Sequence, residues 1–304
     1  MEGESDFPFI DDVFIISKFG KPALFNNQGK IILTGDFTKI QPADLNDTEG
    51  HQFVLVNKGK KQGLYSITGK EILDCSYDKI EANDDYYDAQ ERMYFTIQKS
   101  NKLGLVCNSG EIIIQPVMEK IDVFYVDDKS YQRVKQNGKN GLYTNFRKKL
   151  TNCIYDEISF EEEIIARNIF IIKLNNKYGI LDSSGKTILD PIYSKITPYN
   201  YDGENFYLEI VNEGKKGLVN EKGEIVVPAK FSKIEPIYDI DNLGFFTYEG
   251  KMLGIYSFEG KLILENKFVK KEYSDDDQYM LIFVTKENEK YGLTPTFEVI
   301  KINP

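Results

Sequence analysis

Short stretches in which apolar and polar residues alternate recur along the chain, and polar turns rich in Gly, Asn and Lys separate them. Four clear examples are residues 53–56, 94–97, 169–172 and 280–283. Alternation with a period of two, followed by a turn of this composition, is the pattern of a β-hairpin. No segment keeps a 3.6-residue period between helix caps, so the sequence predicts many short strands and little helix.

A glycine in the short strand after each of these turns recurs at an almost constant spacing. It lies at Gly63, Gly104, Gly141, Gly179, Gly217, Gly254 and Gly292, with Ala23 in its place in the first copy. Successive members are 37 to 41 residues apart, so eight repeats of roughly 38 residues account for all 304 residues. We therefore predict one domain, residues 1–304, made of eight repeats.

Each repeat is expected to contain four strands. The first is the alternating stretch, the second carries the glycine, and the third follows another turn, as at residues 187–189. The fourth, such as residues 191–196, often opens with Pro, which suits an edge or first strand position.

The two ends of the chain favour a closed ring. The last copy stops at Pro304, where Pro191 stands in the most regular copy, so a fourth strand is missing there. Residues 8–13 match the pattern of residues 191–196 and would supply it. We therefore predict an all-β, eight-bladed β-propeller closed by pairing of the N- and C-termini. The alternative is an open β-hairpin array, or solenoid.

The most regular copy, residues 177–196, reads KYGILDSSGKTILDPIYSKI. A glycine preceded by Lys-x and followed by two apolar residues, then Gly-Lys, an Ile-rich strand and P-x-Y-D-x-I, resembles the WG repeat family, also called KWG. The resemblance covers essentially the whole chain, although Tyr178, Tyr291 and other residues replace the namesake Trp. It implies an interaction module of bacterial proteins without catalytic residues.

The long connections that follow the fourth strands are strongly acidic. Together they contain 23 Asp and Glu but only four Lys and Arg, whereas the whole chain has a net charge of −10. These connections are residues 41–52, 81–92, 122–130, 159–168, 197–205, 235–244 and 271–279. In four-stranded antiparallel units they share one face, and the Lys-rich hairpin turns share the other.

Variable loops on a rigid scaffold commonly carry function, and tyrosine suits binding surfaces because it combines an apolar ring with a hydroxyl group. We therefore take acids and tyrosines of these connections as candidate partner-binding residues. They are Asp84, Asp85, Tyr86, Tyr87, Asp88, Tyr125, Asp127, Asp128, Tyr199, Tyr201, Asp202, Tyr238, Asp239, Asp241, Asp275, Asp276 and Asp277.

Residues with catalytic or metal-binding potential are few. His51 is the only histidine, which leaves little basis for His-dependent catalysis or zinc sites. The acids at 275–277 lack the spaced oxygen ligands of a calcium loop. Cys75, Cys107 and Cys153 have no metal-like spacing and are expected to be free thiols. We predict no catalytic residue, metal or cofactor.

The negative charge argues against nucleic acid or an anionic membrane as the main partner. The chain has no apolar run of about 18 residues, and its start lacks the basic and apolar regions of a secretory signal. We expect a cytoplasmic monomer.

These features favour a non-enzymatic binding module or scaffold that uses an acidic, Tyr-bearing loop face to bind a basic protein or peptide. One alternative is an immunity protein that neutralises a toxin such as a nuclease. Another is a channel-centred carbohydrate-binding or hydrolase propeller, in which paired carboxylates would act.

Overall fold

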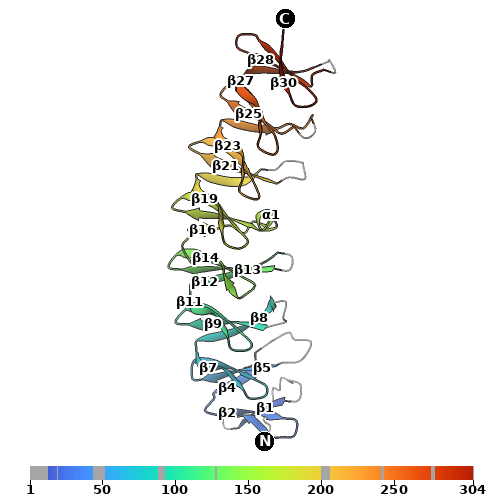
Figure 1. The fold of residues 1–304 in the computed structure, drawn as a ribbon. Coiled ribbons are helices and arrows are strands. Elements are labelled where there is room, and N and C mark those ends of the chain that lie inside the picture. The colour runs from blue at the N-terminus through green and yellow to red at the C-terminus, as the bar shows by residue number, and fades with distance from the viewer. Residues whose placement is uncertain are drawn as a thin grey trace. The chain divides into compact units, whose positions relative to one another are not determined.

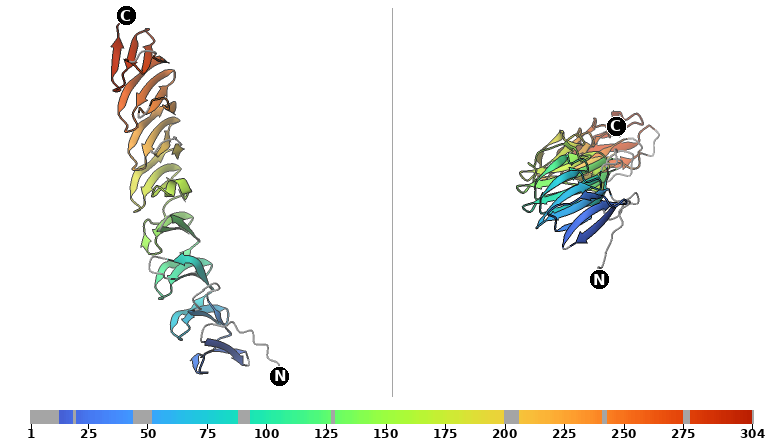
Figure 2. Two further views of the ribbon diagram at one scale, coloured as in Figure 1. Left: turned by 90° about the vertical axis from the view of Figure 1, so that its right-hand side faces the viewer. Right: turned by 90° about the horizontal axis from the view of Figure 1, so that it is seen from below.

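The computed structural model describes residues 13–18, 20–43, 52–87, 93–126, 129–199, 206–240, 243–274 and 278–303, apart from the side chains of Lys18 and residues 84–87. The chain divides into two compact units, Met1–Ile154 and Tyr155–Pro304. Within each unit, small antiparallel sheets follow one another in chain order (Figure 1, Figure 2). The prediction of an all-β chain with little helix is confirmed.

The first unit contains one three-stranded sheet and three four-stranded sheets among its described residues. Their strands are β1 (Val13–Lys18), β2 (Lys21–Asn26) and β3 (Ile31–Leu33); β4 (Lys39–Pro42), β5 (Phe53–Lys58), β6 (Lys61–Ser66) and β7 (Glu71–Tyr77); β8 (Lys79–Tyr87), β9 (Met93–Lys99), β10 (Lys102–Cys107) and β11 (Ile112–Met118); and β12 (Lys120–Val126), β13 (Lys129–Gln136), β14 (Lys139–Thr144) and β15 (Lys148–Lys149).

In its described part, the second unit contains two four-stranded sheets, one seven-stranded sheet and the short helix α1 (Glu162–Ile165). Its strands are β16 (Glu157–Ile158), β17 (Ile169–Leu174), β18 (Lys177–Asp182) and β19 (Thr187–Tyr193); β20 (Lys195–Tyr199), β21 (Tyr207–Asn212), β22 (Lys215–Asn220) and β23 (Ile225–Phe231); and β24 (Lys233–Pro236), β25 (Phe245–Glu249), β26 (Met252–Tyr256), β27 (Leu262–Tyr273), β28 (Leu281–Thr285), β29 (Lys290–Leu293) and β30 (Val299–Ile302).

A sheet does not coincide with a sequence repeat. It starts with the fourth strand of one repeat and continues with the first, second and third strands of the next, as in the order β20-β21-β22-β23. The chain passes between sheets at a single corner residue, Asp78 between β7 and β8 or Ser194 between β19 and β20. The predicted bounds of the fourth strand are therefore wrong, because Pro191 lies inside β19 and the new strand starts at Lys195.

Because each sheet begins with the fourth strand of the preceding repeat, the last strands of the chain form a complete sheet piece without a strand from the N-terminus. The last part of β27 pairs with β28, and β28, β29 and β30 follow in order, so the final four-stranded piece is complete. No sheet closes among the described residues, where β30 is paired with β29. The predicted partner, residues 8–12, lies outside the described residues, and Val13 begins β1, which pairs with β2. Closure and an eight-bladed ring are therefore not confirmed.

The second-strand glycine is required by the close approach of the third strand. A Cβ at Gly179 would lie 2.5 Å from the Leu189 carbonyl oxygen and 2.7 Å from the Pro191 nitrogen. The register between β18 and β19 shifts here, which marks a β-bulge. The same shift and close approach recur at Gly63, Gly104, Gly217 and Gly254.

The first repeat, which has Ala23 at this position, lacks the extended third strand. Its third strand, β3, contains three residues, whereas β7, β11, β19 and β23 each contain seven. The pairing of β2 with β3 ends at Leu24 and Leu33, before residue 23 is reached.

The hydrophobic core lies between consecutive sheets. Leu55 of one sheet packs in a cluster with Ile80 and Phe95 of the next, and the rings of Phe53 and Phe95 meet edge to face at 5.6 Å. Ile80 and Ile196, both from fourth strands, are 2% and 4% exposed. Burying such side chains contributes about 1.5–3 kcal/mol each, so neighbouring sheets stabilise one another.

Turns between the second and third strands add backbone contacts between sheets. Gly69 and Gly223 have φ values of +84° and +78°, and a Cβ there would lie 2.8 and 2.6 Å from the carbonyl oxygens of Ile32 and Ile188. Glycine alone combines this conformation with so close an approach. Within each unit, these turns therefore pack on the preceding repeat, as in other repeat proteins.

Gly179→Ala should destabilise the protein by about 1–3 kcal/mol, because the new methyl group overlaps the backbone of β19. Gly35→Ala is the matched control, since Gly35 is exposed and a Cβ there meets only the ring of Phe37. Urea denaturation followed by circular dichroism compares the two variants. Equal midpoints for Gly179→Ala and the parent chain would contradict the role of this close approach.

Candidate binding surface

Strand order gives each sheet two different ends. The long connections between fourth and first strands leave from the same end as the hairpins between second and third strands, and we call this the loop end. The hairpins between first and second strands and the corner residues lie at the opposite end, which we call the hairpin end. The acidic connections therefore belong to the loop end of each sheet, and the Lys-rich hairpins belong to the hairpin end.

Acidic corner residues offset the lysines at the hairpin end. Asp78 accepts hydrogen bonds from the Lys61 ammonium at 2.5 Å and from the Ser100 amide at 2.6 Å. The hydrogen bond from Lys61 is the main reason that the pKa of Asp78 is lowered. Glu119 accepts a bond from the Gly138 amide at 3.2 Å in the same way. These acids therefore fix the corner to neighbouring strands, and the hairpin end is not a purely cationic surface.

The predicted binding residues fall into three groups. Asp88, Asp127, Asp128, Tyr201, Asp202, Asp241, Asp275, Asp276 and Asp277 lie outside the described residues. Asp84, Asp85, Tyr86 and Tyr87 belong to the end of β8, not to a loop, and only their backbone is described. Tyr125, Tyr199, Tyr238 and Asp239 are described with their side chains.

Two of these tyrosines lie in strands, where the sequence predicted connections. Tyr125 belongs to β12 and is 47% exposed. Tyr199 belongs to β20 and is half-buried, because its ring meets Phe245 edge to face at 6.0 Å. Its hydroxyl donates to the Ile234 carbonyl oxygen at 3.3 Å, and burial raises its pKa. Tyr199 therefore packs against the neighbouring sheet.

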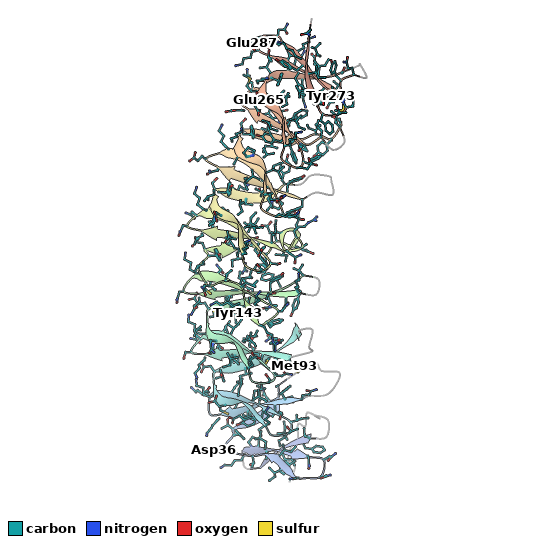
Figure 3. The ribbon with its side chains drawn as sticks, in the orientation of Figure 1. Asp36, Met93, Tyr143, Glu265, Tyr273 and Glu287 are labelled. Atoms are coloured by element: carbon teal, nitrogen blue, oxygen red, sulfur yellow. The ribbon has the colours of Figure 1, made fainter. Side chains whose placement is uncertain are left out.

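An exposed contact at the loop end of the second unit joins the end of β27 to the connection between β24 and β25. The Tyr273 hydroxyl donates to Asp239 Oδ2 at 2.5 Å. Tyr238 beside it is 59% exposed and Tyr273 is 55% exposed. Figure 3 labels Tyr273 on the side of the second unit that carries these connections. Tyr273 was not among the predicted binding residues, although it lies in one of the acidic segments.

Lys271 lies beside this contact at a position that is apolar in the other repeats. It pairs with Phe283, as Ile196 pairs with Ile210 and Ile234 with Thr247. Its ammonium lies 3.3 Å from the centroid of the Phe246 ring, a cation–π contact. Burial lowers the pKa of Lys271, and the charges of Glu235 and Asp239 oppose this shift. Comparison of the repeats position by position would have found this departure from Ile.

Glu235 connects Lys271 to the rest of the sheet. It forms an ion pair with Lys233, and this hydrogen bond is the first cause of the lowered pKa of Glu235. Tyr248 also donates to Glu235, and burial together with this bond raises the pKa of Tyr248 to about 12. Glu235, Tyr238, Asp239, Lys271 and Tyr273 thus form one cluster, which we call the acidic tyrosine cluster.

The described carboxyl groups with shifted pKa values are all shifted downward by hydrogen bonds and nearby cations. They are Asp78, Glu119, Asp122, Asp182, Glu235, Glu272 and Glu289. A general acid would need the opposite shift. Cys75, Cys107 and Cys153 are unpaired thiols, and His51 lies outside the described residues.

No helix in the described part of the chain is long and apolar enough to cross a membrane.

Small antiparallel sheets that share a core with their neighbours define a β-repeat protein. The family model described as WG containing repeat matches residues 178–215 and 217–251. The chain therefore carries WG repeats there, and the predicted family resemblance is confirmed. The matched residues run from β18 to the hairpin after β25 and include the bulged pairs at Gly179 and Gly217. No curated protein matches the sequence.

Several solved structures are similar to the chain at low identity. A eukaryotic initiation factor is 12% identical with a TM-score of 0.29, covering 96% of this chain and 86% of that chain. Dihydro-heme d1 dehydrogenase NirN is 10% identical with a TM-score of 0.26, covering 96% and 73%. Hsv2 of Kluyvelomyces marxianus is 9% identical with a TM-score of 0.26, covering 83% and 93%. These scores define neither a shared arrangement of sheets nor a shared function.

Asp239→Asn should lower the pKa of Tyr273 toward the ordinary value of about 10, because the carboxylate that accepts its proton is the main cause of the raised pKa. A raised tyrosine pKa stabilises the fold at pH below the ordinary value, and this contribution is lost as pH rises through the folded-state pKa. Carbon NMR of the tyrosine Cζ atoms measures the titration, with Tyr273→Phe identifying the signal. Unchanged titration in Asp239→Asn would contradict the contact.

Proposed function

We propose that the protein is a non-enzymatic binding module that holds a basic protein or peptide on the loop end of its sheets. The observation that carries the proposal is the contact of Tyr273 with Asp239, which joins the end of β27 to the connection between β24 and β25 in one exposed surface. The acidic segments of the sequence extend this chemistry to the other repeats. The sheets supply a rigid support, and the connections supply the variable contacts.

The chemistry of this surface fits Lys and Arg side chains. Carboxylates form charge-assisted hydrogen bonds with ammonium and guanidinium groups, and tyrosine rings provide contact area at a small entropic cost. The negative charge would also steer a basic partner toward the surface, an effect that salt weakens. An immunity protein that covers the cationic cleft of a nuclease would be one case of this function.

We also propose that the sheets of each unit form an open β-array. The support is that β27 to β30 already form a complete four-stranded piece, so the last repeat needs no strand from the N-terminus. An open array of this kind is stabilised by contacts between nearest neighbours.

A combined Tyr238→Ala and Asp239→Asn variant should bind a Lys- and Arg-rich peptide about two- to tenfold more weakly, because it loses a carboxylate and an exposed ring. Fluorescence anisotropy with the labelled peptide, from low to physiological salt, measures the affinity. Binding by the parent chain should weaken as salt rises. Replacing Asp84, Asp85 and Asp88 by Asn extends the same assay to the first unit.

Glu213→Gln is the matched control for the second unit. Glu213 is exposed in the hairpin between β21 and β22, so the variant makes the same change in charge at the hairpin end. Its affinity for the peptide should stay close to that of the parent chain. If the Tyr238 and Asp239 variant and Glu213→Gln lost affinity for the peptide equally, or if neither lost any, the loop end would not be the binding surface.

Deletion of residues 1–12 tests the open array. Hydrogen exchange of β28, β29 and β30 should be unchanged, because β30 already has its place in a complete sheet piece. Mass spectrometry of peptides from residues 281–302 measures this exchange in the parent and shortened chains. Faster exchange in these peptides after the deletion would instead support pairing of the termini.

A further inference from the structure

A cavity of about 360 Å³ lies at the loop end of the second unit. Its walls come from four connections and the strand ends beside them. Arg167 follows α1, and Phe206 precedes β21. Asn220 ends β22, Glu224 belongs to the hairpin between β22 and β23, and Phe258 belongs to the hairpin between β26 and β27. All four connections leave their sheets at the loop end. The cavity is therefore on the same end of the sheets as the acidic tyrosine cluster, although it shares no residue with that cluster.

Two phenylalanine rings line the cavity, and one of them is firmly held. Phe258 stacks on Tyr207 with ring centroids 6.4 Å apart, and meets Phe245 edge to face at 5.1 Å. The Tyr207 hydroxyl donates to the Phe258 carbonyl oxygen at 3.2 Å. Phe206, the other ring, is half-buried. The cavity thus has an aromatic wall that is set by the packing of the sheets.

Carboxylates outnumber cations around this wall. The glutamates of the cavity are Glu221, Glu224 and Glu259, all exposed. Glu224 accepts a hydrogen bond from Asn220 Nδ2 at 2.7 Å, which holds its carboxylate in place. The cations are Arg167 and Lys222. Aromatic faces together with carboxylates are the groups that bind a cationic side chain.

The chain itself places a guanidinium group on this wall. The central carbon of the Arg167 guanidinium lies 5.2 Å from the centroid of the Phe206 ring, within the range of a cation–π interaction. Arg167 is exposed and lies two residues after Ile165, the last residue of the short helix α1. The Phe206 ring therefore already has the geometry that an arginine requires.

We propose that this cavity binds an arginine side chain of the basic partner, whose guanidinium replaces that of Arg167 over Phe206 and pairs with the surrounding glutamates. This inference rests on the proposed function and names the group that anchors the partner. Arginine fits better than lysine because its planar guanidinium stacks on a ring and pairs with a carboxylate through two hydrogen bonds. The volume is at the low end of ligand sites, which suits a single side chain.

Two labelled peptides of equal length and charge, one with Arg and one with Lys, provide the test with the full-length chain. Fluorescence anisotropy should show tighter binding of the Arg peptide by the parent chain. Phe206→Leu keeps an apolar side chain but removes the aromatic face. It should therefore weaken binding of the Arg peptide about two- to fivefold and reduce the preference for the Arg peptide over the Lys peptide. N-acetyl-arginine amide, followed by NMR of the Phe206 ring, tests the guanidinium group outside a peptide.

Arg167→Gln provides a second variant that leaves the core intact. It should strengthen binding of the Arg peptide, because the ring no longer holds an internal guanidinium. Lys186→Gln is its control, since it removes the same charge from an exposed hairpin residue at the loop end, outside the cavity. The increase in affinity for the Arg peptide should be at least twofold larger in Arg167→Gln than in Lys186→Gln.

The outcomes separate this inference from the proposed function. Unchanged Arg-peptide affinity in Phe206→Leu, or equal gains in the two charge variants, would overturn the arginine site. The proposed binding function would still be supported if the combined Tyr238→Ala and Asp239→Asn variant lost affinity for the basic peptide. Binding of N-acetyl-arginine amide at Phe206 without binding of either peptide would support the site but reject the basic peptide partner. Absence of all binding would reject both.

Discussion

The fold depends on one close approach, that of the third strand to the glycine of the second strand. At Gly179 the backbone of Leu189 and Pro191 fills the space where a side chain would begin. The resulting bulge lets the third strand continue to a single corner residue, from which the next sheet starts. Where Ala23 stands instead, the third strand contains only three residues. The glycine thus permits the close approach but does not by itself set strand length, since β15, which follows Gly141, contains only two residues.

Because the chain enters each sheet by its fourth strand, the two ends of the sheets acquire different chemistry. At the hairpin end, acids such as Asp78 are used to hold corners and turns. At the loop end, Tyr238 in a connection and Tyr273 at the end of β27 are exposed. This division explains why the proposed surface and the proposed arginine cavity both lie at the loop end. Neither requires a departure from the repeated backbone.

Departures from the repeat are therefore informative. Fourth strands carry buried isoleucines such as Ile80 and Ile196, yet the last one carries Lys271, whose ammonium lies over Phe246 near acidic groups. A charge at a core position is costly unless it is paired, so its neighbours had to change with it. Phe146 is a second case: it has a φ of 52° in a turn, is fully buried and stacks on Tyr94 at 4.5 Å. Its ring thus packs this turn against the preceding sheet.

The sequence alone determined the repeat, the strands and hairpins, the scarcity of helix and the place of the acidic connections, because these follow from local periodicity and turn composition. It did not determine which strands share a sheet, because the corner at Ser194 is one residue long and only packing between sheets shows where one ends. The sequence also could not show that Tyr199 is half-buried and Tyr238 exposed. Tyr199 is half-buried because its ring packs on Phe245, and its hydroxyl donates to the Ile234 carbonyl, 35 residues away, whereas Tyr238 is exposed. Contacts between residues one repeat apart are decided by tertiary structure, since no local pattern encodes them.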